Sequence, residues 1–229
     1  MNTLFSHVCV VTMDDRMSVW TDAFVGVTDG KISWLSKHAP EEKPDQIIDA
    51  TGMVLMPGLI NCHTHLPMQL LRGYADDLKL QEWLNDYIFP REDRLDGRCV
   101  RAATTLAVAE CLKFGVTSVS DMYYFCDDIC DVIAKSGMKA NISRGTSMFL
   151  GDDFDFEKFP ACQELVALKE KWHNYDGGRI KIEASIHAEY TSTYQLWDAL
   201  SEFCINEGIG MQVHVSETKL EHDQCVERY

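Results

Sequence analysis

The first 52 residues consist of short apolar runs separated by polar turns. The runs lie at 7–12, 23–27, 32–35 and 47–50. Asp29-Gly30 stands between the second and third runs, and Asp-Gly between β-forming segments is a strong hairpin signal. The pattern predicts a small antiparallel β domain over residues 1–52, the N-terminal part of a small β-sandwich, without a cluster of catalytic side chains.

The pattern changes at Met53 to strands that alternate with helices. Apolar runs predict strands at 53–61, 117–122, 139–143, 180–186 and 211–215. Apolar residues at helical spacing predict helices at 80–88, 97–114, 127–136, 156–173, 193–206 and 219–228. Strands and helices in alternation, joined by short loops, form βαβ units with a parallel sheet. We therefore expect residues 53–229 to form one α/β domain.

Two folds build a parallel sheet in this way, the open doubly wound sheet and the (β/α)₈ barrel. No glycine-rich phosphate loop follows the first strand, which argues against a nucleotide-binding open sheet. Polar side chains instead gather at the carboxyl ends of the strands, where a barrel builds its active site. They are His63, His65, Asp121, Arg144, His187, His214 and Glu217. The predicted fold is a TIM-type (β/α)₈ barrel, of which this chain holds about the first five βα units.

Composition narrows the possible classes of function. The 229 residues include 21 Lys and Arg against 36 Asp and Glu, a formal net charge of −15, which argues against a nucleic-acid or anionic-membrane surface. Nine cysteines at irregular spacing, without a secretory leader, indicate reduced thiols in a cytoplasmic protein. No apolar run approaches the roughly 20 residues that span a bilayer. The expected partner is a small-molecule substrate.

His63 and His65 end the first strand with one residue between them, so their side chains lie on the same face. Such a pair is either half of a metal site or two polar residues leaving a strand for solvent. His214, at the end of the fifth strand, would complete a set of three imidazoles, which leaves an open position on zinc as catalytic sites require. Water on such an ion has its pKa lowered towards ~7. Lys181 starts the fourth strand rather than ending it, so we expect one metal ion rather than two.

Glu217 lies three residues beyond His214, at the same predicted rim. Its carboxylate could move a proton between the activated water and the leaving group of a substrate. It could equally be the first-turn acid of the helix that begins at Lys219, because helix N-termini favour acids. Both interpretations remain open from the residues alone.

Longer motifs resemble the metal-dependent amidohydrolase superfamily. The first is PGLINCHTH at 57–65, followed by LLRGYADDL at 70–78. Further motifs are QEWL at 81–84, IFPRED at 88–93, SRG at 143–145, IHAEYT at 186–191 and VHVSET at 213–218. Together they are most similar to the branch that holds 5′-methylthioadenosine/S-adenosylhomocysteine deaminases and s-triazine chlorohydrolases. The resemblance covers essentially the whole chain.

The resemblance implies roles for particular residues. His63, His65 and His214 match the ligands of one divalent metal, with zinc expected and iron as the alternative. Glu217 matches the proton shuttle. Four further residues match positions that bind a nucleoside substrate. Trp83 matches a position that packs on the nucleoside, and Glu92 one that hydrogen-bonds to the ribose. Arg144 matches a position that contacts the distal end of the substrate, and His187 a histidine near the substrate.

Each substrate-binding match has a structural alternative. Trp83 could be a core aromatic, and Glu92 could pair with Arg91 or Arg94 on a solvated face. Arg144 could form an ion pair with Asp121 at the strand ends.

The resemblance implies a metal-dependent hydrolytic deaminase of an adenosine-type nucleoside such as 5′-methylthioadenosine or S-adenosylhomocysteine. In that reaction metal-bound hydroxide attacks the aminated purine carbon. The alternative within the family is an amidohydrolase that acts on another aminated or halogenated heterocycle, such as guanine, cytosine or an s-triazine.

Members of the family also supply a histidine from the sixth strand and an aspartate from the eighth. Neither is present here, since the only histidine after His214 is His222, inside a predicted helix. The resemblance therefore implies the N-terminal part of such an enzyme, completed by a C-terminal segment or within a homo-oligomer. We expect residues 1–229 alone to be inactive or poorly folded, and a third interpretation is a silent fragment that serves as an assembly or interaction module.

Overall fold

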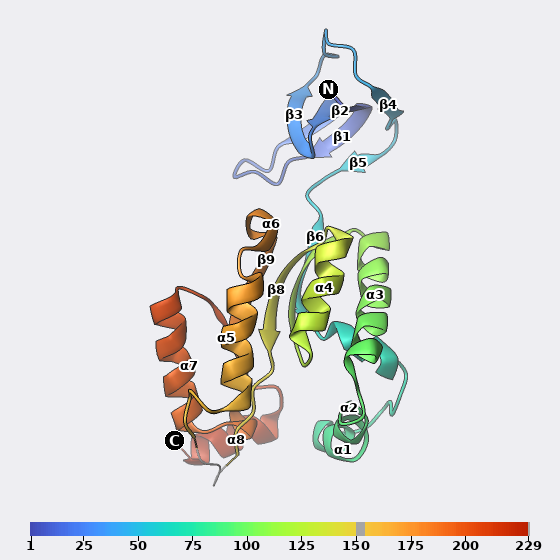
Figure 1. Ribbon diagram of the computed structural model, residues 1–229. Coiled ribbons are helices and arrows are strands. Elements are labelled where there is room, and N and C mark those ends of the chain that lie inside the picture. The colour runs from blue at the N-terminus through green and yellow to red at the C-terminus, as the bar shows by residue number, and fades with distance from the viewer. Residues whose placement is uncertain (150–153, 229) are drawn as a thin grey trace. The chain divides into compact units, whose positions relative to one another are not determined.

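The computed structural model describes residues 1–149 and 154–228. The chain divides into two compact units, Met1–Gly58 and Leu59–Tyr229, and each is described here by itself (Figure 1). The division follows Gly58, whereas the sequence pattern placed it after residue 52. The reason is that β5 (Val54–Leu55) pairs with the first strand of the N-terminal unit.

The N-terminal unit is a five-stranded sheet around one central strand. Its members are β1 (Thr3–Val11), β2 (Val19–Thr28), β3 (Lys31–Ser36), β4 (Gln46–Asp49) and β5. β1 is antiparallel to β2 but parallel to both β4 and β5, so the prediction of a purely antiparallel sheet was wrong. The charged segment after β3 returns the chain to the other side of β1, and β4 therefore runs in the same direction as β1. Val8, Val10, Ala23, Val25 and Ala50 form the core of this sheet.

The predicted strand at 53–61 is two strands that belong to different sheets. Val54–Leu55 pairs with β1, and β6 (Leu59–Thr64) pairs with the second unit's next strand. Pro57 lies between them and has no backbone N–H to donate to a sheet ladder. The apolar run is therefore continuous in sequence but not in hydrogen bonding.

The second unit contains a five-stranded parallel sheet. After β6 come β7 (Val116–Tyr123), β8 (Lys139–Arg144), β9 (Ile180–Ala188) and β10 (Met211–His214), and they lie side by side in chain order. A doubly wound sheet reverses its strand order at a switch point, whereas a barrel does not. The predicted fold class, the first five βα units of a TIM-type barrel, is confirmed.

Helices cover the outer face of this sheet (Figure 1). They are α3 (Gly97–Lys113), α4 (Cys126–Ser136), α5 (Pro160–Trp172) and α7 (Tyr194–Glu207), whereas the short α6 (Tyr175–Gly178) precedes β9 and α8 (Lys219–Arg228) packs against the helical turn Glu189–Thr191. The helix predicted from Phe156 begins only at Pro160, because proline lacks an N–H and is suited to the first helical position. Between the helices and strands lies a core in which Ile129, Ile142, Ile182, Ile186 and Leu196 are fully buried.

The helix predicted at 80–88 has an unusual centre. α1 (Leu80–Glu82) passes into a π-helix over Trp83–Ile88 and then into α2 (Phe89–Glu92). The Phe89 N–H bonds to the Leu84 carbonyl, five residues earlier, instead of to the residue four earlier. The apolar pattern predicted the helix but not this wider turn, which π-helical segments often adopt at functional sites.

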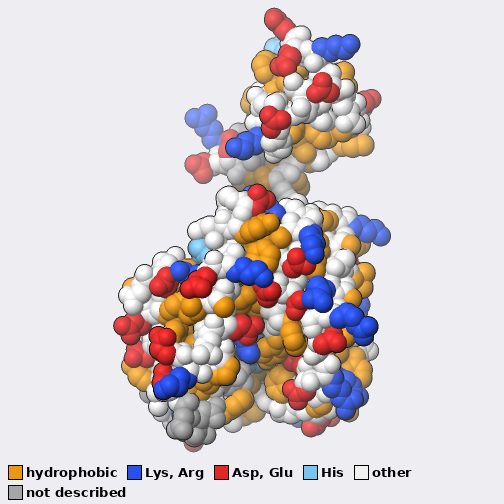
Figure 2. Space-filling view, viewed as in Figure 1, with side chains coloured by type: hydrophobic (Ala, Val, Ile, Leu, Met, Phe, Trp, Pro, Cys, Tyr) orange, Lys and Arg blue, Asp and Glu red, His pale blue; other side chains and the backbone are white. Residues whose placement is uncertain are grey.

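Charged side chains of both signs are mixed over the visible face of the second unit, with hydrophobic side chains between them (Figure 2). The excess of acidic residues is thus distributed rather than gathered into one patch on this face. Among the described helices none has the length and apolar character needed to cross a membrane.

Candidate active site

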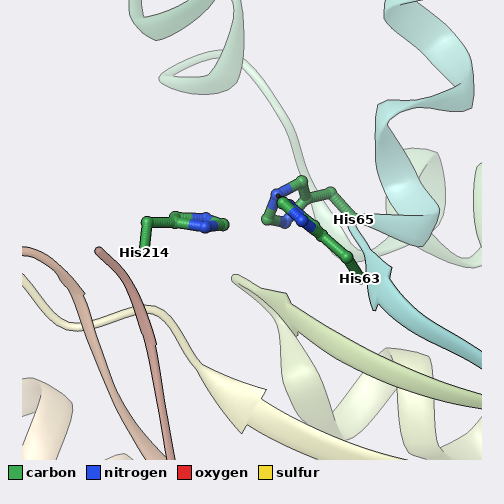
Figure 3. Close-up of side chains that lie close together, drawn as sticks. All are labelled: His63, His65 and His214. Carbon is green, nitrogen blue, oxygen red and sulfur yellow. Dashed lines mark hydrogen bonds between the residues drawn. The ribbon is translucent and has the colours of Figure 1, made fainter. Parts of the chain in front are cut away.

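Three histidines converge at the carboxyl ends of the strands (Figure 3). His63 is the penultimate residue of β6 and His65 follows the strand, while His214 ends β10 at the opposite side of the sheet. One ring nitrogen from each lies within 4.8 Å of the others, and the His63 and His65 Nε2 atoms are 3.3 Å apart. The fold therefore assembles side chains separated by about 150 residues in sequence into one cluster.

The protonation of this cluster suits metal binding. His65 Nδ1 lies 2.6 Å from the Met122 carbonyl oxygen, which can only accept, so Nδ1 carries the proton and Nε2 keeps its lone pair. Burial lowers the pKa of His65 and of His214, with each ring's neighbouring histidines acting in the same direction. Neutral imidazole is the form that binds a metal ion.

The spacing also fits a divalent ion. Two imidazole nitrogens bound tetrahedrally to one zinc ion, each about 2.1 Å from it, lie about 3.4 Å apart. The 3.3 Å between the His63 and His65 nitrogens agrees with that value, and His214 needs only a small movement to join them. His63, His65 and His214 can therefore hold a metal and leave at least one position open.

Asp121 supports this cluster from β7. Its carboxyl is fully buried, and one oxygen accepts from the Leu66 N–H at 2.6 Å and the Thr64 hydroxyl at 2.8 Å. Both partners are chain neighbours of His65. Asp121 and Met122, adjacent on one strand, thus fix both the backbone around His65 and its ring.

Glu217 lines the same cavity as the three histidines. Burial raises the pKa of its carboxyl, and the nearby Glu221 carboxylate raises it further. The Tyr190 hydroxyl lies 3.5 Å from Glu217 Oε2, and the Glu217 N–H donates to Glu221 Oε2 at 2.7 Å. A carboxyl group with a raised pKa holds a proton more readily than an ordinary glutamate, which suits a group that accepts and then releases one.

His187 reaches this cavity from the end of β9, and its ring centroid is 5.4 Å from that of His214. Burial lowers the pKa of His187 to about 4, so the ring is neutral at pH 7. Thr191 Oγ1 donates to the Ala188 carbonyl and therefore accepts from His187 Nδ1, 3.0 Å away. His187 thus has its proton on Nδ1 and presents Nε2 as a hydrogen-bond acceptor.

Trp83 and Glu92 line this cavity of about 250 Å³ from the helical segment that contains the π-helix. Glu92 Oε1 accepts from the Tyr123 hydroxyl at 2.6 Å, and burial raises the pKa of the Glu92 carboxyl. The alternative pairing of Glu92 with Arg91 or Arg94 is therefore wrong. Trp83 is half-buried beside the histidines rather than enclosed in the core.

Arg144 lies away from the histidines, at an adjoining cavity that also contains Glu92 and His187. Its Nε donates to Glu164 Oε2 at 2.9 Å, and its guanidinium carbon is 5.1 Å from the Tyr124 ring centroid. The alternative ion pair with Asp121 is wrong, because Asp121 is enclosed against β6 and the partner is Glu164 of α5.

The sequence reasoning missed Tyr123 and Thr191, which hold Glu92 and His187. Tyr123 follows Asp121 by two positions on β7, so period-two alternation at a strand end could have indicated it. No comparable signal pointed to Thr191, because its contact with His187 depends on the short helical turn Glu189–Thr191.

Fold and site together define a (β/α)-barrel protein in which three histidines that could hold a metal ion lie at the carboxyl ends of the strands. The sequence profile of the amidohydrolase family matches residues 54–229, and the chain belongs to that family. The resemblance inferred from the motifs is thereby confirmed.

Named relatives cover nearly all of this chain. A 5′-deoxyadenosine deaminase of Methanosarcina acetivorans is 36% identical over 99% of the chain and 51% of its own length. A 5-methylthioadenosine/S-adenosylhomocysteine deaminase of Thermoanaerobacter pseudethanolicus is 31% identical over 100% of the chain and 52% of its own length. The chain thus spans about half the length of the curated relatives it matches.

Solved structures share the fold. An adenosine deaminase from Xanthomonas campestris with bound zinc superposes with a TM-score of 0.88 at 29% identity, over 100% of this chain and 52% of its own. An atrazine chlorohydrolase from Arthrobacter aurescens, complexed with zinc, superposes with a TM-score of 0.81 over 93% of this chain and 52% of its own. At 21% identity the second likeness shows the fold alone.

Proposed function

We propose that the protein is a metal-dependent hydrolytic deaminase of an adenosine-type nucleoside, such as 5′-methylthioadenosine or S-adenosylhomocysteine. The observation that carries this is the convergence of three imidazoles, those of His63, His65 and His214, and the carboxyl group of Glu217 on one cavity. The names of the two deaminase relatives support the choice of substrate.

His63, His65 and His214 would hold one divalent ion, zinc in the first place and iron as the alternative. When bound, such an ion supplies a Lewis acid that makes water a nucleophile near neutral pH. The zinc bound in the adenosine deaminase structure from Xanthomonas campestris supports the first choice.

Glu217 is the proposed proton shuttle. Its carboxylate accepts one proton from the attacking water and delivers it to the ring nitrogen beside the aminated carbon. It then carries the second proton of that water oxygen to the amine, so that ammonia leaves and the oxygen stays on the purine carbon. The raised pKa of Glu217 favours this, because the group can then hold the proton between the two transfers. His187, neutral and fixed by Thr191, is proposed to position the purine through a hydrogen bond to Nε2.

The remaining residues are proposed to bind the nucleoside. Trp83 packs against it, and the second oxygen of Glu92 accepts from a ribose hydroxyl while the first remains on Tyr123. Arg144 lies at the distal end of the substrate, in the adjoining cavity.

The test is Glu217→Gln in the metal-loaded protein. We expect ammonia release from 5′-methylthioadenosine to fall by roughly 10²–10⁴-fold, the range for loss of a general acid–base group, with bound metal and KM little changed. Metal analysis of His214→Ala is the companion measurement, and it should show loss of the ion. Full turnover by Glu217→Gln would contradict the proposal.

A second candidate keeps the site but changes the substrate to a free heterocycle such as guanine, cytosine or an s-triazine. It is motivated by the motifs, which resemble those of s-triazine chlorohydrolases as well as those of nucleoside deaminases. A substitution of Glu92 distinguishes the two candidate functions, because only a nucleoside has a ribose for Glu92 to bind and a free base has none. Glu92→Gln should raise KM for a nucleoside at least ~10-fold and leave a free base almost unaffected, in line with the cost of a lost charged hydrogen bond.

The setting of the reaction is also part of the proposal. All nine cysteines are free in the structure, which supports a reducing, cytoplasmic compartment. We propose a small-molecule substrate and a homo-oligomer or complementing C-terminal segment as partner. Ammonia release and metal content, measured on residues 1–229 with and without such a segment, also test the alternative of a silent assembly module.

A further inference from the structure

Glu217, the proposed proton shuttle, has few contacts of its own that orient its carboxylate. Within the described part of the chain its side chain makes one hydrogen bond, from the Tyr190 hydroxyl to Oε2, and the two oxygens are 3.5 Å apart. A group that takes up and releases protons needs free oxygens, so its direction has to be set through the main chain. The backbone around Glu217 therefore decides where the carboxylate points.

The chain turns tightly between β10 and Glu217. Only two residues separate Glu217 from His214, the last residue of the strand. The second of them, Ser216, has a φ of 53°, in the left-handed region that residues other than glycine seldom adopt. Such a conformation costs free energy and persists only where surrounding contacts hold it. The turn that brings both side chains to one cavity therefore needs a stabilising contact.

Glu221 of α8 supplies that contact. Its Oε2 accepts from the Glu217 N–H at 2.7 Å, and the residue is only 4% exposed. Its own N–H donates to the Thr218 hydroxyl at 3.1 Å, just before α8 begins at Lys219. A hydroxyl that accepts from the third residue of a helix is one half of a capping box.

The other half of this capping box is displaced by one residue. In a regular box the glutamate accepts from the N–H of the capping residue itself, which here is Thr218. Glu221 accepts instead from the preceding residue, Glu217. The bond that would otherwise serve the helix end thus holds the backbone of the proposed shuttle.

α8 is in turn tied to the wall of the same cavity. Near its end, Arg228 pairs with Glu189 of the helical turn Glu189–Thr191. That turn also carries Tyr190, which contacts Glu217, and Thr191, which holds His187. A helix fixed at both ends in this way gives Glu221 a defined position relative to the cavity.

We propose that Glu221 is a positioning residue, which holds the Glu217 N–H and so aims the Glu217 carboxylate for proton transfer. The inference rests on the proposed deamination and adds a residue to the same site. Glu221 does not line the histidine cavity and acts only through Glu217.

Two substitutions separate the acceptor oxygen from the rest of the side chain. Glu221→Leu fills the buried space without an acceptor, whereas Glu221→Gln keeps an oxygen that can accept from the Glu217 N–H. For the metal-loaded protein with 5′-methylthioadenosine, we expect kcat of Glu221→Leu to fall about 10- to 100-fold, as for a reacting group displaced by about 1 Å. KM and bound metal should remain at wild-type values, and Glu221→Gln should retain most of kcat.

Glu227→Leu is the matched control, because Glu227 is exposed on the same helix and the change is the same. It should turn over substrate as the wild type does. An unchanged kcat in Glu221→Leu, or an equal loss in Glu221→Leu and Glu221→Gln, overturns the inference and leaves the deaminase intact. If Glu221→Leu does not fold, Glu221→Asp replaces it, since a carboxylate one methylene shorter cannot reach the Glu217 N–H and should give the same fall.

Hydrogen exchange at the Glu217 amide, followed by NMR, decides the inference without turnover. The amide should exchange slowly in the wild type and in Glu221→Gln, and faster in Glu221→Leu. Equal exchange rates in all three overturn the inference. Absence of ammonia release from the wild type overturns the proposed function, and the exchange rates then show on their own whether Glu221 holds the backbone of Glu217.

Discussion

Asp121 shows how one side chain determines the position of a candidate metal ligand. It lies on the strand next to β6, is fully buried, and binds the Thr64 hydroxyl and the Leu66 N–H on either side of His65. Its other carboxyl oxygen has no hydrogen-bond partner among the described residues. An ionised carboxyl in such surroundings is costly, and burial raises the pKa of Asp121 to about 7.

The raised pKa predicts a specific dependence of stability on pH. Because the folded-state pKa of about 7 exceeds the ordinary value of 3.8, the folded protein binds the proton more tightly than the unfolded chain. The stabilisation that the protonated Asp121 gives the folded protein is therefore complete below about pH 4 and is lost as the pH rises to 7. Ionisation of Asp121 should lower the free energy of unfolding of the wild type by about 2 kcal/mol between pH 5 and 7. Asp121→Asn keeps one acceptor oxygen but cannot ionise, so the variant should lack this fall.

Urea unfolding at the two pH values measures this effect. Asp198→Asn, at an exposed position on α7, is the control and should retain the wild-type pH dependence. Equal pH dependence in the wild type and Asp121→Asn would show that Asp121 does not titrate in this interval.

At the scale of elements, the segment from α1 through the π-helix to α2 forms one side of the cavity. Leu84 and Ile88 are buried, and the cavity is lined by Trp83 at the start of the π-helix and by Glu92 at the end of α2. The wide π-turn sets their relative orientation, because it inserts one residue beyond the α-helical repeat. The proposed nucleoside site thus depends on a local departure from ideal helix geometry.

Deletion of Asp86 tests this dependence. Asp86 is exposed within the π-helix, and its removal allows a regular α-helix in place of the wide turn that presents Trp83 and Glu92 to the cavity. We expect KM for a nucleoside to rise at least ~10-fold, as binding contacts are lost, while metal affinity is unchanged. Asp86→Ala keeps the chain length and should behave as the wild type. An unchanged KM after the deletion would mean that the π-turn has no role in binding.

At the scale of the whole molecule, the parallel sheet ends at two outer strands, β6 and β10, within the described residues. Leu59 and Ile60 of β6 are 51% and 68% exposed. An outer strand with apolar side chains and unpaired backbone groups favours pairing with another strand. This agrees with the proposal that another segment or copy completes the sheet.

Ile60→Lys tests the role of this strand. Lysine on an outer strand disfavours strand addition, so the weight-average mass of residues 1–229, measured by light scattering after gel filtration, should fall towards that of a monomer. Ile205→Lys is a matched control, since Ile205 is 80% exposed but lies on α7. If Ile205→Lys changes the mass and Ile60→Lys does not, β6 is not the associating strand.

The predictions from sequence held where short-range patterns determine the structure. Alternating strands and helices predicted the parallel sheet, and the single-residue spacing of His63 and His65 predicted that they share a face. They failed where the outcome depends on distant partners. The apolar run 53–61 is divided between two sheets, and the mixed character of the N-terminal sheet follows from which neighbours β1 meets.

The sequence by itself determined the candidate metal ligands and the family. Strand periodicity and motif spacing depend on neighbouring residues, and they encode that His63, His65, His214 and Glu217 lie at or just after the carboxyl ends of β6 and β10. Only the tertiary structure decided that Arg144 pairs with Glu164 and Glu92 with Tyr123. Those pairs join different strands and helices, and the packing of the barrel, rather than any local pattern, brings them within hydrogen-bonding distance.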